Sequence, residues 1–169
     1  MDESMQQFNS PTKGRMSLSD VVKDIHGYMR QDDRRQYAVV IGTDSQVYTR
    51  TDFVTAVVVR RVGAGGRYFW ARQQHDNFKS LRDRIYMETL KSLELAEVMS
   101  AQMHAVLKND KRFSSADQKS LIEIHVDVGE NGETRDMIRE VVGMVRGNGY
   151  EVKIKPLSYA AFVVADYHT

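Results

Sequence analysis

Four acidic residues stand where a carboxylate is costly unless something binds it. Asp44 and Asp127 each follow an apolar stretch typical of a buried strand, and Glu88 interrupts the apolar stripe of a long amphipathic segment. Asp166 follows a short apolar run close to the end of the sequence. Because an ionised carboxylate in an apolar setting is unfavourable unless it is paired or binds a metal, the four together predict one acidic metal site.

Each carboxylate on its own also has a plainer interpretation. Glu88 could lie near a helix start with its tip in water, and Asp44 could close an Asx turn after its strand. Asp127 could accept hydrogen bonds from amides of the loop that follows it, and Asp166 could be a solvated residue in a last helical turn. The joint placement of the four, in the order strand, helix, strand, helix, favours the metal site.

The donor types indicate which metal such a site would take. The chain contains no Cys, and no pair of His has the spacing of a zinc site. Oxygen ligands suit hard ions, so we expect Mg²⁺ or Mn²⁺. Two carboxylates about 4 Å apart repel each other by about 4 kcal/mol at an effective dielectric constant of ~20, so converging carboxylates need a cation or must hold protons. Two divalent ions roughly 3.5–4 Å apart can catalyse phosphodiester hydrolysis.

The composition sets broad limits on the class of protein. A chain of 169 residues with 41% hydrophobic and 28% charged residues is typical of one globular domain with its own core. There is no apolar run of about 18 residues, so we expect no membrane partner. The N-terminal residues lack the pattern of a secretory signal, and with no Cys the expected location is the cytoplasm. A net charge of +1 means that a nucleic acid would have to be held by a local patch.

Hydrophobic periodicity divides the chain into an arm and one domain. Residues 1–16 are polar and predict an N-terminal arm, and residues 17–169 predict a single domain that begins with a helix over 18–30. Three strands then follow, with a glycine hairpin at 63–66 between the second and the third. The remaining elements are a long helix, a strand, a helix, a strand and a last helix. The expected strands are 37–43, 53–61, 67–72, 121–127 and 150–155, and the later helices are 80–109, 133–146 and 159–168.

This order of elements predicts an α/β fold. The first three strands form a meander, and helical crossovers, which are nearly always right-handed, bring in the last two strands. We therefore expect a five-stranded mixed sheet with the strand order 3-2-1-4-5 and helices on both faces. The N-terminal helix is an addition to that sheet.

Four short motifs resemble those of the YkuK-type ribonuclease H-like proteins, a bacterial family of unknown function. They are FNSPTKG at residues 8–14, IGTDSQ at 41–46, VDVG at 126–129 and VAD at 164–166. The resemblance implies a ribonuclease H-like fold and a metal-dependent nuclease. It also implies roles: Asp44 would bridge two ions, Glu88 and Asp127 would hold the ion on the leaving-group side, and Asp166 would hold the ion that activates water.

Candidates for substrate contact lie beside the four carboxylates. We take Ser45, Gln46, Arg82 and Arg84 as substrate-binding candidates, because Arg and Lys side chains can hold phosphates. A second basic group on the hairpin could also bind phosphates, with Tyr68 or Trp70 stacking on a base, or it could simply protect a sheet edge. The basic residues of this hairpin are Arg60, Arg61, Arg67 and Arg72.

Three histidines fall near the predicted site. His75 follows the third strand, whose end lies on the same side of the sheet as the site. His125 shares a strand face with Asp127, and we interpret it as a packed or hydrogen-bonded histidine rather than a ligand. His168 could assist proton transfer or product release, although it is the second-last residue of the sequence.

Three classes of function compete. The first is a Mg²⁺- or Mn²⁺-dependent nuclease acting on nucleic acid through the four carboxylates. The second is a nucleic-acid-binding module that keeps the fold but has little or no catalytic activity, since a fold does not fix a function. The third is nucleotide phosphate transfer of the actin-like kind, which we disfavour because those enzymes clamp a nucleotide between two such domains.

Overall fold

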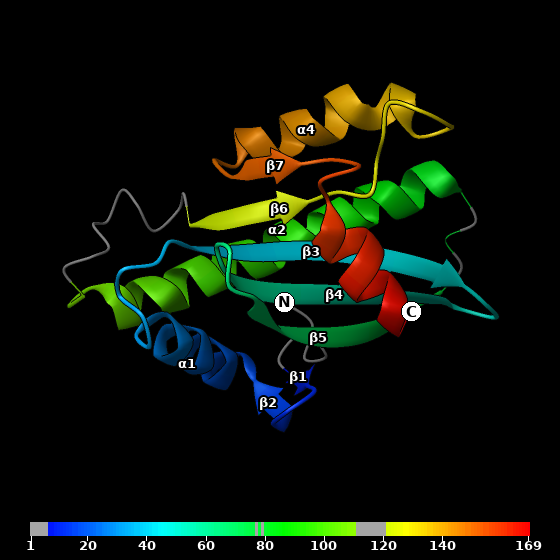
Figure 1. The fold of residues 1–169 in the computed structure, drawn as a ribbon. Coiled ribbons are helices and arrows are strands. Elements are labelled where there is room, and N and C mark those ends of the chain that lie inside the picture. Colours follow the sequence, from blue (N-terminus) through cyan, green and yellow to red (C-terminus); the bar gives the residue numbers. More distant parts are fainter. Residues whose placement is uncertain (1–6, 77, 79, 111–120) are drawn as a thin grey trace.

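A seven-stranded mixed sheet organises the molecule, with the strand order β2-β1-β5-β4-β3-β6-β7. The computed structural model describes residues 7–76, 78, 80–110 and 121–169 (Figure 1). The strands are β1 (Gln7–Ser10), β2 (Gly14–Ser17), β3 (Tyr37–Val47), β4 (Thr51–Arg61), β5 (Gly66–His75), β6 (Ile122–His125) and β7 (Glu151–Lys153). The helices are α1 (Leu18–Met29), α2 (Leu81–Leu107) and α4 (Ile138–Gly147), with a 3-10 turn at Arg135–Met137, a π-helix at Ala160–Ala165 and a last 3-10 turn at Asp166–His168.

The centre of the sheet is a long antiparallel meander. β3 pairs with β4 over eleven residue pairs, and β4 pairs with β5 over ten. β6 joins the other side of β3 in parallel, and β7 joins β6 in parallel. Parallel neighbours need long crossovers, which α2 and α4 supply. The carboxyl ends of β3 and β6 therefore lie at one end of the sheet, together with the end of β5.

Helices cover both faces of the sheet, as expected. Val39 and Ile41 point into the main core, which α1, α2 and α4 close from one side. Ala38 and Val40, which alternate with them along the strand, point to the other face. The π-helix packs on that face through Ala160. Continuous burial along β3 follows from this double cover, because a central strand has no solvent face.

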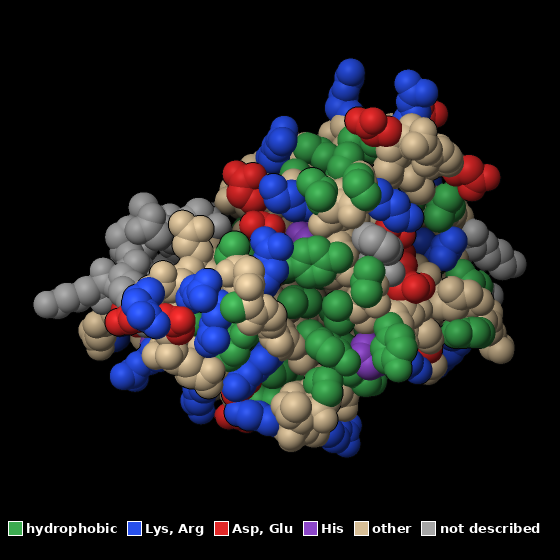
Figure 2. All heavy atoms as spheres, viewed as in Figure 1, with side chains coloured by type: hydrophobic (Ala, Val, Ile, Leu, Met, Phe, Trp, Pro, Cys, Tyr) green, Lys and Arg blue, Asp and Glu red, His purple; other side chains and the backbone are tan. Residues whose placement is uncertain are grey.

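The face that carries the π-helix is only partly covered. Figure 2 shows hydrophobic side chains gathered across its middle, with charged side chains mostly toward the rim. Val163 of the π-helix and Tyr167 after it remain 51% and 81% exposed. No helix among the described residues combines the length and apolar composition that a membrane crossing requires.

The expectation of a five-stranded sheet is wrong, because β1 and β2 extend the sheet beyond β5 to seven strands. The five expected strands keep their relative order, as β5-β4-β3-β6-β7. Residues 7–17 form the hairpin β1–β2, and Asn9 of β1 pairs with Trp70 at the edge of β5. The predicted arm over 1–16 is thus wrong for residues 7–16, while residues 1–6 lie outside the described part. The physical reason is Phe8, whose side chain is fully buried in the main core. One large apolar residue anchors a segment that is otherwise polar.

Element boundaries also differ around the predicted site. β3 continues to Val47 instead of ending at residue 43, because the β3–β4 ladder runs on as far as the pair Val47–Thr51. Asp44 consequently lies inside a paired strand, opposite Val54, and does not close a turn. The last helix begins as a π-helix and ends as a 3-10 turn, so Asp166 sits where its winding changes.

Candidate active site

The four predicted carboxylates come from four elements and act on one another electrostatically. Asp44 lies on β3, Glu88 on α2, Asp127 just after β6, and Asp166 at the start of the last 3-10 turn. The charges of Asp166 and Asp127 both raise the pKa of Asp44, and those of Asp44 and Asp127 raise the pKa of Glu88. The fold therefore brings the four acidic groups into one region.

Glu88 is the most deeply placed of the four. Its side chain belongs to α2, and the residue is only 6% exposed. Burial raises the pKa of Glu88 to about 8, a hydrogen bond from Ser45 opposes this rise, and the Asp44 charge adds to it. The Ser45 hydroxyl donates to Glu88 Oε1 over 2.5 Å. The interpretation in which the Glu88 tip reaches water is wrong.

Two contacts between β3 and α2 fix the position of Glu88. Thr43 and Ser45 share one face of β3, and their hydroxyls contact Ser92 at 2.8 Å and Glu88 at 2.5 Å. Two residues along a strand advance about 6.6 Å, and four residues along a helix advance about 6 Å. The two pairs therefore match in spacing and align the helix with the strand. This alignment places the Glu88 carboxylate beside the strand that carries Asp44.

Asp44 is half-buried and sits between opposing influences. Burial raises its pKa to about 6, the Asp166 charge adds to the rise, and a hydrogen bond from the Ser45 backbone opposes it. The Arg84 guanidinium also favours the ionised form of both Asp44 and Glu88. Arg84 Nη1 donates to the Ser45 carbonyl over 3.3 Å, while its buried Nε has no hydrogen-bond partner among the described residues.

Asp127 forms an ion pair with a lysine. Lys155 Nζ lies 2.9 Å from Asp127 Oδ1. The amide of Gly129 donates to the Thr134 hydroxyl over 3.2 Å, so this loop amide is not available to cap Asp127. Asp166, by contrast, is exposed, as its plainer interpretation expects. The sequence carries no signal for Lys155, because a lysine before a proline at a strand end is ordinary.

The donor set fits a hard divalent cation in its chemistry. All four groups are carboxylates. The pKa values of Asp44 and Glu88 are raised first by burial and further by neighbouring negative charge, which a bound cation would compensate. Their present side-chain positions do not form a ready cage. In the described part of the chain, no three His, Asp or Glu side chains are grouped so that they could hold one ion.

The four substrate-binding candidates are held in different ways. The Ser45 hydroxyl is engaged by Glu88, and Arg84 is turned toward the Ser45 carbonyl. Arg82 is exposed and donates to Glu140 over 2.7 Å, so it links α2 to α4. Gln46 is exposed next to the carboxylates. The structure therefore places Ser45 and Arg84 beside Glu88 and Asp44, whereas the side chain of Arg82 is engaged by α4 and that of Gln46 is exposed.

The three histidines have distinct surroundings. His125 is 1% exposed and its Nδ1 accepts a hydrogen bond from the Ala160 amide over 3.2 Å, so the interpretation of a packed histidine is confirmed. Burial lowers its pKa to about 4, which keeps the ring neutral. His75 contacts the buried Lys91, Nε2 to Nζ, at 2.8 Å. His168 stacks on Trp70 with ring centroids 4.4 Å apart.

The hairpin arginines are mostly engaged within the fold. Arg67 donates two 3.0 Å hydrogen bonds to Asp24 on α1. Arg61 lies over the ring of Tyr28 at 4.6 Å, and Arg72 forms an ion pair with Asp52. Trp70, proposed as a possible base-stacking residue, is covered by the ring of His168. These contacts favour the structural interpretation of the hairpin over a role in substrate binding.

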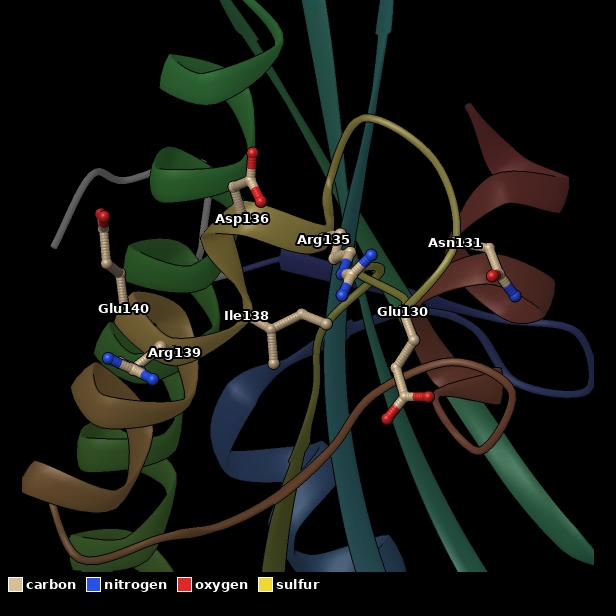
Figure 3. A pocket seen from close by; sticks show the side chains of 7 residues that line it. All are labelled: Glu130, Asn131, Arg135, Asp136, Ile138, Arg139 and Glu140. Atoms are coloured by element: carbon tan, nitrogen blue, oxygen red, sulfur yellow. The ribbon is translucent and has the colours of Figure 1, made fainter.

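A cavity of about 860 Å³ opens beside the loop that follows Asp127 (Figure 3). The loop after β6 and the start of α4 line it, and Arg135 and Ile138 point into its centre (Figure 3). Its lining residues are Glu130, Asn131, Arg135, Asp136, Ile138, Arg139 and Glu140. Neither Arg135 nor Arg139 has an ion-pair partner among the residues that the structure describes. The cavity lining therefore carries two arginines together with three carboxylates, and none of the four predicted acidic residues is part of it.

The fold and the site define a class, and comparison with known proteins agrees with it. The chain belongs to the ribonuclease H-like family, whose model, described as "Ribonuclease H-like", matches residues 20–169. Over 165 residues it is 33% identical to the uncharacterized protein YkuK of Bacillus subtilis (strain 168), a match that covers 96% of each chain. The resemblance to the YkuK-type proteins is therefore confirmed. No solved structure gives a significant match.

Proposed function

We propose that this protein is a divalent-metal-dependent nuclease. The observation that supports this most is the electrostatic coupling of Asp44, Glu88, Asp127 and Asp166 in a ribonuclease H-like fold, with Glu88 buried among them. A carboxylate held away from water in a charged group of this kind is typical of a functional site. A family of this fold suggests a substrate that is a nucleic acid.

The four carboxylates would hold Mg²⁺ or Mn²⁺, with Asp44 at the centre of the group. When bound, such ions supply charge neutralisation at the phosphate oxygens and a water of lowered pKa. The reaction is hydrolysis: a water oxygen forms a bond to phosphorus, and the bond from phosphorus to the leaving sugar oxygen breaks. Ser45 keeps Glu88 in place for this, since its hydroxyl donates to that carboxylate.

Cations around the site would hold the substrate. Arg84 lies within the field of Asp44 and Glu88, and Arg135 and Arg139 line the neighbouring cavity. Phosphate contacts position a nucleic acid without reading its sequence. This arrangement supports binding of the phosphate backbone and does not distinguish RNA, DNA or a hybrid.

The activity test uses a single isosteric change at the site. The wild-type chain and Asp44→Asn are incubated with labelled RNA, DNA and hybrid oligonucleotides in Mg²⁺ or Mn²⁺, and cleavage is followed on gels. We expect cleavage by the wild type and a loss of about 10²–10³-fold in the variant, the typical cost of removing one electrostatic catalytic group. Asp33→Asn, an exposed carboxylate after α1, is the control and should cleave normally.

A second function is favoured by one specific observation. Lys155 forms an ion pair with Asp127, and in the described residues no three acidic or histidine side chains are grouped around one ion position. A chain with these features could bind nucleic acid without cleaving it efficiently. In that case the oligonucleotides would bind, as a filter or anisotropy assay would show, yet remain intact at every metal concentration. Cleavage by Asp44→Asn at the wild-type rate would contradict the nuclease assignment itself.

A further inference from the structure

The contact between Lys155 and Asp127 joins a lysine cation to one of the four carboxylates. Lys155 Nζ is 2.9 Å from Asp127 Oδ1, and the two side chains are 47% and 22% exposed. A lysine ammonium is a compact point charge on a flexible stem, with three donors and no preferred plane. It therefore places positive charge where a metal ion bound by Asp127 would otherwise lie.

The backbone holds both residues of this pair in place. Parallel pairing continues past the ends of β6 and β7, since the Val126 amide donates to the Lys153 carbonyl over 3.0 Å and the Lys155 amide donates to the Val128 carbonyl over 2.9 Å. Asp127 is thus bracketed by paired residues, and Lys155 is itself paired. The sheet therefore keeps the two residues within reach of each other, and their side chains meet as an ion pair.

Gly129 provides the space for the lysine stem. A Cβ atom at residue 129 would lie 3.2 Å from Lys155 Cβ and 3.6 Å from its Cδ, closer than an ordinary van der Waals contact for the first of these. The hydrocarbon stem of Lys155 therefore runs over a residue with no side chain. A side chain at residue 129 would crowd this stem, so the glycine permits the position from which the ammonium group reaches Asp127.

We propose that Lys155 is a built-in counter-ion of Asp127 that competes with a divalent cation for this carboxylate. The first ion would then bind at the Asp44 side of the site, and binding at the Asp127 side would require Lys155 to leave. This inference rests on the proposed function in assigning Asp127 to the metal site. Lys155 is a positioning residue in this scheme, because it acts through Asp127 and not on the substrate.

The charges set the size of the expected effect. At 4 Å in water, two unit charges interact by about 1 kcal/mol, and a divalent ion facing an ammonium group doubles this repulsion. Each 1.4 kcal/mol corresponds to a tenfold change in affinity. Without screening, the doubled repulsion would correspond to about thirtyfold in affinity. Salt screens part of the repulsion between exposed charges, so neutralising Lys155 should strengthen the weaker class of divalent-ion binding by about tenfold.

The test measures Mn²⁺ binding directly and needs no substrate. The full chain is titrated with Mn²⁺ at constant ionic strength, and free Mn²⁺ is read from its electron paramagnetic resonance signal. The variants are Lys155→Met, which keeps the stem, and Lys155→Arg, which keeps the charge. Lys153→Met is the matched control, because it removes the same charge from the same strand end. In the wild type, Lys153 makes no ion pair with a carboxylate in the described part of the chain.

We expect Lys155→Met to bind its weaker Mn²⁺ about tenfold more tightly, while Lys155→Arg and Lys153→Met stay within twofold of the wild type. Equal affinities in Lys155→Met and the wild type would overturn the inference and leave the nuclease proposal intact. Equal gains in Lys155→Met and Lys153→Met would also overturn it, since general charge would then explain the effect. Failure of every protein to bind Mn²⁺ would overturn both proposals.

Discussion

At the scale of single residues, the site is defined by carboxylates whose ionisation the fold opposes. The pKa of Glu88 is raised to about 8, mainly by burial, and that of Asp44 to about 6. Such groups weaken a protein that lacks a counter-ion, because the unfolded chain releases their protons more easily. The acidic region therefore costs stability in the metal-free protein near neutral pH, and this cost supports the proposed metal site.

The Glu88 pKa leads to a prediction about stability and pH. A raised pKa means that its contribution to stability is fully present below about 4.5 and is lost as pH rises toward about 8. At pH 7 the difference corresponds to roughly 3 kcal/mol. Glu88→Gln, which can still accept the Ser45 hydrogen bond, should remove this loss, so the variant should gain stability over the wild type as pH rises from 5 to 8.

Urea unfolding in a metal chelator at pH 5, 7 and 8 measures this effect. Glu94→Gln, an exposed carboxylate on the same helix, is the control and should follow the wild type at each pH. Parallel pH profiles for Glu88→Gln and the wild type would show that Glu88 ionises normally in the folded state. That result would remove the main electrostatic argument for the site.

At the scale of elements, the last turn of the chain is held by aromatic contacts that the sequence did not reveal. His168 stacks on Trp70 with ring planes 15° apart and lies near Tyr68, and Arg72 donates to the His168 carbonyl. Asp166 stands two residues before His168, on the same 3-10 turn. The stack on β5 thus restrains an exposed carboxylate that has little packing of its own.

Removing this stack should disturb Asp166 more than the sheet. An aromatic pair contributes about 0.5–1.5 kcal/mol, so His168→Ala should weaken Mn²⁺ binding by about twofold to tenfold while the unfolding midpoint changes little. His168→Phe restores a ring that can stack on Trp70 and should recover the wild-type affinity. Unchanged Mn²⁺ affinity in His168→Ala would mean that Asp166 is placed by the π-helix alone.

The N-terminal hairpin is a second element that pattern analysis missed. Phe8 is fully buried in the main core, and its cross-strand neighbour Met16 is only partly buried. Phe8→Ala should destabilise the protein by about 3–5 kcal/mol, the usual cost of truncating a core Phe. Met16→Ala should cost clearly less. Loss of under about 1 kcal/mol in Phe8→Ala, measured by urea unfolding, would contradict the hairpin as part of the core.

At the scale of the whole molecule, the long periodic elements were predictable and the short ones were not. The helix predicted over 18–30 is α1, and the long helix predicted over 80–109 is α2, because apolar residues recur at helical spacing along both segments. The hairpin β1–β2 was missed, since one buried aromatic residue in eleven gives no periodic signal. The extended ends of β3 and β4 were missed because polar residues there are paired in a ladder without being apolar.

The site was predictable as a set of residues but not as an arrangement. Asp44, Glu88, Asp127 and Asp166 could be selected because each interrupts or ends an apolar run. Their partners could not, because Ser45 on Glu88 and Lys155 on Asp127 depend on long-range register between elements. The spacing offers one clue in retrospect. Thr43 and Ser45, two apart on a strand, share a face, and so do Glu88 and Ser92, four apart on a helix, so the two pairs can meet.

The central claim is that these four carboxylates form one metal site, and anomalous scattering from a crystal soaked in Mn²⁺ tests it most directly. We predict a manganese peak within bonding distance of Asp44, with side-chain oxygens of its three acidic neighbours turned toward the peak or toward a second one. A crystal saturated with Mn²⁺ that shows no peak among Asp44, Glu88, Asp127 and Asp166, or carboxylates too far apart to share ions, would contradict the claim.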